Sequence, residues 1–190
     1  FVLPYTIADY LSADIRTGEI PTNSAEFDAA EKEIKDKVNF FVNNKGTHSV
    51  DYFHKKLGHI MWNKVGMGRT PEGLREAIAE IDEVKKEFWK DVKVMGETEG
   101  MNTELEKAFR VADFIELGQL MAIDALHRNE SCGGHFREDH ATPEGEAERD
   151  DVNFKYVGAW EYQGDDNKQE VLHKEDLVYE NIEVKARSYK

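Results

Sequence analysis

The most chemically dense part of this sequence is the run from Arg128 to Asp139. It places guanidinium, carboxylate, thiol and imidazole groups around the pair Gly133–Gly134, directly after the most apolar helical stretch of the chain. Glycine ends helices because it readily adopts backbone conformations that other residues avoid. The run therefore predicts either a small reactive site or a polar corner that fixes a helix end.

A metal centre is the first candidate for a reactive site. Cys132, His135 and His140 are ligand types that zinc prefers, and Asp139 could complete the set. A structural zinc site normally draws on a second close pair of ligands, however, and Cys132 is the only cysteine of the chain. We assign no metal ligand, and a metal-binding protein using Cys132, His135 and His140 stays an alternative that metal analysis would test.

A thiol nucleophile activated by a neighbouring imidazole is the second candidate. Cys132 and His135 are close enough in sequence to meet, but no oxyanion donor can be named beside them. The segment Gly66-Met67-Gly68 lacks the third glycine of a dinucleotide-binding loop. We therefore predict no catalytic and no cofactor-binding residue in this chain.

A structural corner is the third candidate, and the charges favour it. Arg128, Glu130, Arg137 and Asp139 alternate in sign around the glycines. Paired guanidinium and carboxylate groups form bidentate contacts that can fix a helix end against a neighbouring surface.

Helical periodicity dominates the sequence before this run. Apolar residues recur every three or four positions in four segments, which begin at capping residues near Ser24, Ser49, Thr70 and Asn102. The last segment, ending near Arg128, is apolar around most of its circumference, which predicts a central position. Trp62, Trp89 and Trp160 are expected in the core, as is usual for aromatic residues at such spacing.

The composition changes after His140. An acidic loop leads to alternating apolar and polar residues between Phe154 and Tyr162, then turn residues at 164–167 and a returning strand from Gln169 to His173. We predict a mainly α fold: a helical bundle of three long antiparallel helices plus shorter ones, with a small C-terminal β-hairpin. The expected division is 1–22, a helix end and linker; 23–140, the bundle; and 141–190, the acidic loop, hairpin and extended tail.

The amino-acid composition excludes some classes of binding partner. The net charge of −14 argues against nucleic acid or an anionic membrane surface as a partner. We expect no direct membrane insertion, because no long uncharged apolar run is present, and a single cysteine fits a reducing cytoplasm. The chain begins at Phe1 without Met, and we expect it to be a fragment of a longer protein.

The residues then resemble a known family. The run Arg128-Asn129-Glu130-Ser131-x-Gly133-x-His135-x-Arg137-Glu138-Asp139, followed by Arg149-Asp150-Asp151, is similar to the C-terminal motif of succinate dehydrogenase and fumarate reductase flavoprotein subunits. The segment Leu57-x-x-Ile60-Met61-Trp62-x-x-Val65-Gly66-x-x-Arg69 also resembles the helical bundle of that family. Cys132 departs from the pattern, since most members have Arg there.

The resemblance implies a flavoprotein that interconverts succinate and fumarate with covalently held FAD. It implies electron transfer to an iron-sulfur subunit and, through a membrane cytochrome subunit, exchange with quinone. The residues that hold flavin and substrate in the family all lie upstream of this region, so the fragment alone is expected to be inactive and to bind no cofactor. Its location is expected to be the cytoplasm, peripheral on the inner face of the cytoplasmic membrane.

Within this resemblance we predict that Glu130, His135, Arg137 and Asp139 form a docking corner, which braces the chain's own flavin domain and helps to present it to the iron-sulfur subunit. Two alternatives stay open. The first is the C-terminal domain of an L-aspartate oxidase-like flavoenzyme, which resembles the same motif. The second is an autonomous helical interaction module.

Overall fold

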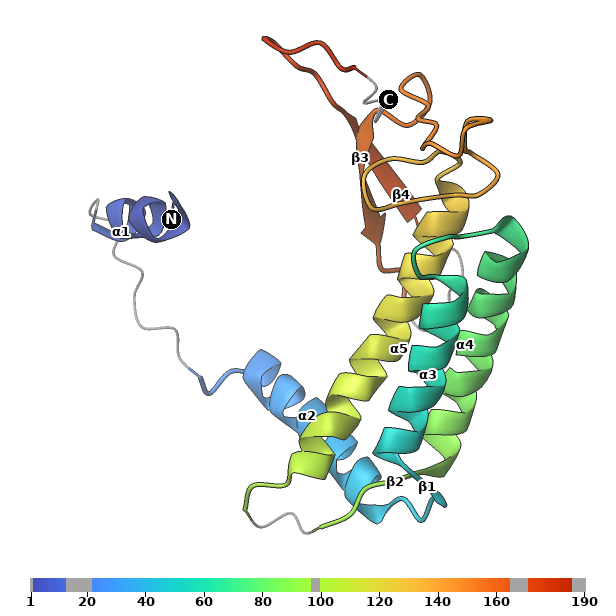
Figure 1. Ribbon diagram of the computed structural model, residues 1–190. Coiled ribbons are helices and arrows are strands. Elements are labelled where there is room, and N and C mark those ends of the chain that lie inside the picture. The colour runs from blue at the N-terminus through green and yellow to red at the C-terminus, as the bar shows by residue number, and fades with distance from the viewer. Residues whose placement is uncertain (1, 13–21, 97–99, 165–170, 186–190) are drawn as a thin grey trace.

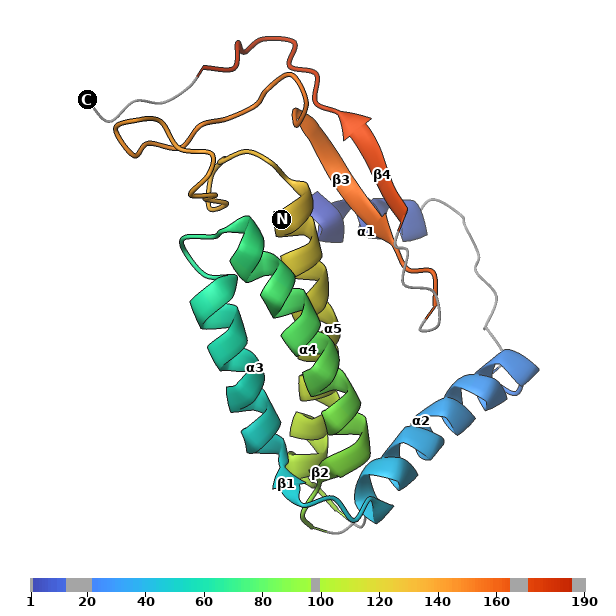
Figure 2. The same cartoon turned by 90° about the vertical axis from the view of Figure 1, so that its right-hand side faces the viewer.

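Three helices packed side by side form the body of the molecule (Figure 1). The computed structural model describes residues 2–12, 22–96, 100–164 and 171–185. The bundle helices are α3 (Val50–Lys64), α4 (Pro71–Asp91) and α5 (Thr103–His127). In both views α3 and α5 run in one direction and α4 runs in the opposite direction (Figure 2).

Capping residues explain where these helices begin. The Ser49 hydroxyl accepts from the backbone N–H of Tyr52, and the Thr70 hydroxyl accepts from that of Gly73. The Asn102 side chain accepts from two N–H groups of the first turn of α5. Each contact satisfies donors that have no partner inside the helix, so the predicted start sites are confirmed.

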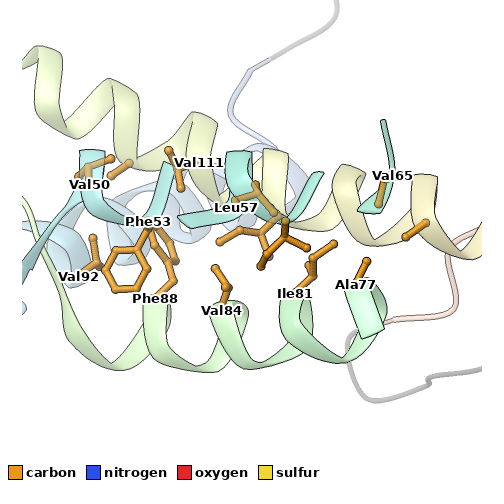
Figure 3. Packing of buried hydrophobic residues seen from close by; sticks show 14 of the residues in the cluster. Val50, Phe53, Leu57, Val65, Ala77, Ile81, Val84, Phe88, Val92 and Val111 are labelled. Atoms are coloured by element: carbon orange, nitrogen blue, oxygen red, sulfur yellow. The ribbon is translucent and has the colours of Figure 1, made fainter. Parts of the chain in front are cut away.

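The core lies between these helices (Figure 3). On α4, buried apolar residues recur every three or four positions from Leu74 to Phe88. The Phe88 ring packs edge to face against Phe53 of α3, with the ring centroids 5.3 Å apart. The α5 seam consists largely of small residues: Ala108, Val111, Ile115, Gly118, Ala122 and Ala125. Small side chains let the helix axes approach closely, as ridge-into-groove packing requires.

Two short parallel strands close one end of the bundle. β1 (His48–Ser49) pairs with β2 (Val92–Lys93), with His48 opposite Val92. Gly46 lies against this pairing: a Cβ there would come within 2.1 Å of the Asp91 carbonyl oxygen. Only glycine allows this close backbone approach.

A β-hairpin follows the bundle. β3 (Tyr156–Glu161) pairs antiparallel with β4 (Val171–Asp176). A mainly helical chain with a small antiparallel strand pair is therefore confirmed. The predicted turn residues 165–167 and the first residues of the returning strand, 169 and 170, lie outside the described residues, as do 186–189 of the predicted tail.

The remaining helices, α1 (Val2–Ser12) and α2 (Ala25–Asn43), differ in how far they join the bundle. Only Phe41 of α2 is buried, and the N-terminal part of this helix points away from the bundle (Figure 2). α1 stands apart from the bundle (Figure 1), and the predicted linker residues 13–21 lie outside the described part of the chain.

Two expectations about burial were wrong. Trp62 and Trp89 were expected in the core, but 83% and 37% of their surface is exposed; the α3 face that carries Trp62 has no helix against it. The central helix α5 is covered by α3 and α4 yet leaves Phe114, Leu117 and Met121 open to solvent.

Candidate functional site

Arg137 caps the C-terminal end of α5. Its side chain is 2% exposed, and Nη1 donates to the main-chain oxygens of Ala125 at 3.1 Å and Leu126 at 3.3 Å. Nε and Nη2 each lie 2.8 Å from a carboxylate oxygen of Asp139. The last carbonyls of a helix lack internal donors and carry partial negative charge, so a buried guanidinium is well placed there.

Arg69 does the same for α3. Its Nε lies 3.0 Å from the main-chain oxygen of Val65 and 3.1 Å from that of Gly66. Its backbone accepts from Glu138 N at 2.9 Å and donates to Phe136 O at 3.1 Å. The loop after α3 and the polar run after α5 are therefore joined at their backbones.

His135 connects the two helix ends. Its Nδ1 lies 2.6 Å from Arg69 Nη1, and its Nε2 lies 2.9 Å from the main-chain oxygen of Arg128. A guanidinium only donates, so Nδ1 accepts and Nε2 carries the proton, which is the neutral imidazole. Burial lowers the pKa of His135, and the neighbouring positive charges of Arg69, Arg137 and Arg128 lower it further.

Glu130 fixes the acidic loop to this corner. Its side chain is 3% exposed, with one carboxylate oxygen 2.6 Å from Arg128 Nη1 and the other 2.9 Å from the backbone nitrogen of Asp150. Ser131 is also buried, and its hydroxyl bonds to both backbone groups of Arg137. Side chains of the run thus hold the loop that follows it.

The hairpin is attached to the same end of α5. Trp160 Nε1 donates to Asp124 Oδ1 at 2.8 Å, and His127 Nε2 lies 3.1 Å from the Tyr156 hydroxyl. The Arg128 guanidinium lies over the Tyr156 ring, 5.2 Å from its centroid. Cation–π and hydrogen-bond contacts therefore link strand and helix.

The structure brings together all four residues of the predicted docking corner. Glu130 and Arg137 are buried, His135 is half-buried, and the Asp139 side chain is 40% exposed. The hydrogen bonds from Arg137 hold the pKa of the Asp139 carboxyl below its usual range. Of the four, Asp139 is the residue most open to a partner.

The sequence patterns predicted no role for Arg69, and they did not predict the contacts of Arg128. The signal for Arg69 was its place just beyond the end of a predicted helix, where a cation stabilises the final carbonyls. Its partner His135 lies 66 positions further along the chain. That pairing depends on how α3 and α5 pack, which local patterns do not specify.

Neither the thiol nucleophile nor the metal centre considered for Cys132 and His135 is supported by this geometry. Both ring nitrogens of His135 are engaged, so its imidazole is not directed at the exposed thiol of Cys132. Over the described ranges, no group of three or more His, Cys, Asp and Glu side chains is placed to hold a metal ion.

A second polar cluster lies at the opposite end of the bundle. Asp91 Oδ2 is 2.6 Å from Thr47 Oγ1 and 2.5 Å from His48 Nδ1. Hydrogen bonds from Thr47 and His48 lower the pKa of Asp91 to about 2. A catalytic triad would use the two ring nitrogens separately, but here Nδ1 faces both the hydroxyl and the carboxylate, which indicates a structural link.

Crossing a membrane requires a helix of about 20 mostly apolar residues. Among the described residues, no helix is both long and apolar enough for it.

Comparisons with known proteins identify the family of this bundle. Residues 54–189 match the family model described as fumarate reductase flavoprotein C-term. The chain belongs to that family. The match includes the end of α3, both capping arginines and the hairpin.

Individual relatives agree with this assignment. The fumarate reductase flavoprotein subunit of Proteus vulgaris is 33% identical over 134 residues, which cover 70% of this chain and 22% of the relative. The succinate dehydrogenase flavoprotein subunit of Bacillus subtilis is 26% identical over 118 residues, covering 62% of this chain and 20% of the relative. The chain thus spans about a fifth of the length of these relatives.

The fold is also found in a solved structure of a quinol-fumarate reductase with menaquinol molecules. The TM-score is 0.70 and the identity 26%, and the match covers 86% of this chain and 27% of the other.

Proposed function

We propose that this chain is the C-terminal region of the flavoprotein subunit of an enzyme that interconverts succinate and fumarate. The observation that carries the proposal is the family match over residues 54–189, which includes the entire polar run. The L-aspartate oxidase alternative has no comparable support, since the model that matches is described as fumarate reductase.

FAD would bind outside the described residues. A dinucleotide site requires a strand, a glycine-rich loop and a helix whose N-terminus meets the pyrophosphate. The described strands are two pairs of short strands, and neither pair leads into such a loop. The residues present do not fit this cofactor, and we assign them no step in the reaction.

The contribution of this region is mechanical. The two arginine caps and His135 join the ends of α3 and α5, which gives the corner a defined shape. We propose that this docking corner braces the flavin domain and helps to present it to an iron-sulfur subunit, in a complex held by a membrane cytochrome subunit at the inner face of the cytoplasmic membrane. Residues 1–22 would be the connection to the flavin domain, with 23–140 as bundle and 141–190 as appendage.

The proposed activity is tested on the full-length polypeptide that contains this chain, produced together with its iron-sulfur subunit. Bound flavin is measured by absorbance after denaturation, and turnover by succinate oxidation with an artificial electron acceptor. Flavin content near one per polypeptide with succinate-dependent turnover is expected. A full-length protein with neither flavin nor turnover would exclude the proposal.

The docking corner is tested in the same protein with Asp139→Asn, which removes the exposed charge and nearly preserves the side-chain shape. Reduced recovery of the iron-sulfur subunit at unchanged flavin content is expected. Arg110→Ala serves as control, because Arg110 is exposed on α5 and forms an exposed ion pair with Glu106. Flavin content, assembly and turnover all unchanged in Asp139→Asn and in Arg137→Ala would show that the docking assignment is wrong.

A further inference from the structure

The joint between the ends of α3 and α5 depends on the protonation state of one imidazole. His135 Nδ1 accepts from Arg69 Nη1 at 2.6 Å, and His135 Nε2 donates to the main-chain oxygen of Arg128 at 2.9 Å. Arg69 lies in the loop between α3 and α4, and Arg128 is the C-cap residue of α5. One ring thus joins two elements, and it does so only while one of its nitrogens accepts.

Three guanidinium groups surround this ring. Arg69 reaches it from the loop after α3, Arg128 from the end of α5, and Arg137 from the polar run itself. Burial and these three positive charges lower the pKa of His135. The surroundings therefore favour the neutral ring and oppose a further positive charge.

The carboxylates of the neighbouring segments are engaged with other groups. These carboxylates belong to Asp124, Glu130, Glu138 and Asp139. Glu130 pairs with Arg128, and Asp139 pairs with Arg137. Asp124 accepts from the indole of Trp160 and acts on Arg69 only through its charge, while Glu138 Oε1 would lie 2.8 Å from a Cβ on Gly68. Within the described residues, no carboxylate forms an ion pair with Arg69.

We propose that His135 is a pH-sensitive switch that joins the loop after α3 to the polar run when neutral and releases it when protonated. A proton taken up from water turns Nδ1 into a donor, so the ring no longer accepts from Arg69. Two cations then face each other where the hydrogen bond was. The loop therefore separates from the run in acid and rejoins it when the proton returns to water, while the apolar core keeps the helices packed.

Two backbone hydrogen bonds report the state of this switch. Arg69 N donates to Phe136 O at 3.1 Å, and Glu138 N donates to Arg69 O at 2.9 Å. Both bonds cross from the loop to the run, so they persist only while the two segments stay together. Opening would also change the surface of the proposed docking corner, and that consequence alone rests on the proposed function.

Hydrogen exchange of the full-length polypeptide measures the opening. Exchange is followed by mass spectrometry at about pH 7 and about pH 5.5, with labelling times scaled for the pH dependence of intrinsic exchange. Peptides carrying the amides of Arg69 and Glu138 are expected to lose protection by up to about tenfold per pH unit, since opening takes up one proton. Peptides from α4 are expected to keep theirs. Unchanged protection at Arg69 and Glu138, or an equal loss in α4, would overturn the inference.

Two substitutions assign the effect to this ring. His135→Gln keeps one acceptor and one donor but takes up no proton, so protection at Arg69 and Glu138 is expected to be the same at both pH values. His140→Gln is the matched control, because His140 lies in the same run, 3.7 Å from Asp139, and the pH dependence should remain. A pH dependence that persists in His135→Gln, or disappears in His140→Gln, would contradict the switch. Absence of flavin from the unsubstituted protein would instead exclude the proposed function and leave the switch intact.

Discussion

The arginine side chains of this protein differ in burial. Arg137 is 2% exposed and binds carbonyls of the last turn of α5, whereas Arg110 is 66% exposed and faces one glutamate. A buried guanidinium has lost its water, so its protein partners are essential to it. An exposed pair contributes little because water and salt screen it.

Arg137→Ala should therefore lower the free energy of unfolding of this chain by about 3 kcal/mol, near the lower end for breaking a buried charge pair because Asp139 is partly exposed. Arg137→Lys should restore only part of the loss, since an ammonium cannot form the bidentate contact with Asp139. Urea denaturation measures both. Arg110→Ala is the matched control, and a loss for Arg137→Ala no larger than for the control would contradict the capping role.

His135 makes stability depend on pH. Burial and three arginines lower its pKa in the folded state below the ordinary value of 6.5. The unfolded chain therefore takes up the proton first, and stability that is complete above pH 6.5 is lost as the pH falls through the folded-state pKa. His127 acts in the same direction, because burial also lowers its pKa.

The free energy of unfolding should thus decrease between pH 7 and 5. His135→Gln should make this decrease smaller, since glutamine cannot take up the proton. His59→Gln, which replaces an imidazole in exposed surroundings on α3, is the control. A pH dependence of unfolding that is the same in His135→Gln and in the unsubstituted chain would show that His135 is not responsible.

At the scale of the elements, two glycines lie in opposite surroundings: Gly46 is crowded by backbone atoms, and Gly58 faces open space. A Cβ on Gly46 would lie 2.1 Å from Asp91 O and 2.5 Å from Val92 O, both backbone atoms of the β2 end. A Cβ on Gly58, within α3, would meet nothing within 4 Å. The same substitution should therefore have opposite effects at the two positions.

Gly46→Ala should destabilise this chain by about 1–3 kcal/mol or more, because the backbone of one segment must move. Gly58→Ala should stabilise it by about 0.5–1 kcal/mol, the helix-propensity difference between the two residues. Thermal unfolding followed by circular dichroism compares them. A Gly46→Ala chain as stable as Gly58→Ala would mean that β1 and β2 do not approach as described.

The elements also show what could be predicted from sequence. Starts of α3, α4 and α5 were predictable because Ser49, Thr70 and Asn102 act on their own first turns. The exposure of Trp62 was not, because it depends on which side of α3 receives a neighbour. The corner was predictable as a cluster of charges, but the link between the two helix ends was not, since it joins His135 to Arg69, 66 positions away.

At the scale of the whole molecule, the C-terminal end of α5 is a junction. The polar run, the acidic loop and the hairpin all attach there, through Arg137, Glu130 and Trp160. The hydrophobic core lies between α3, α4 and α5, away from this junction (Figure 3). The hairpin therefore depends on a few directional contacts, and the bundle depends on buried apolar area.

This division predicts that the hairpin opens without the bundle. Trp160→Phe removes the 2.8 Å hydrogen bond to Asp124 but retains most of the apolar ring. Loss of one such bond to a carboxylate is worth about 1.5 kcal/mol or somewhat more. Amide hydrogens of β3 and β4 should then exchange about tenfold faster, while those of α4 stay unchanged, because local opening follows local contacts. Trp62→Phe controls for ring size at an exposed position, and equal acceleration in α4 and the hairpin would show that they unfold as one unit.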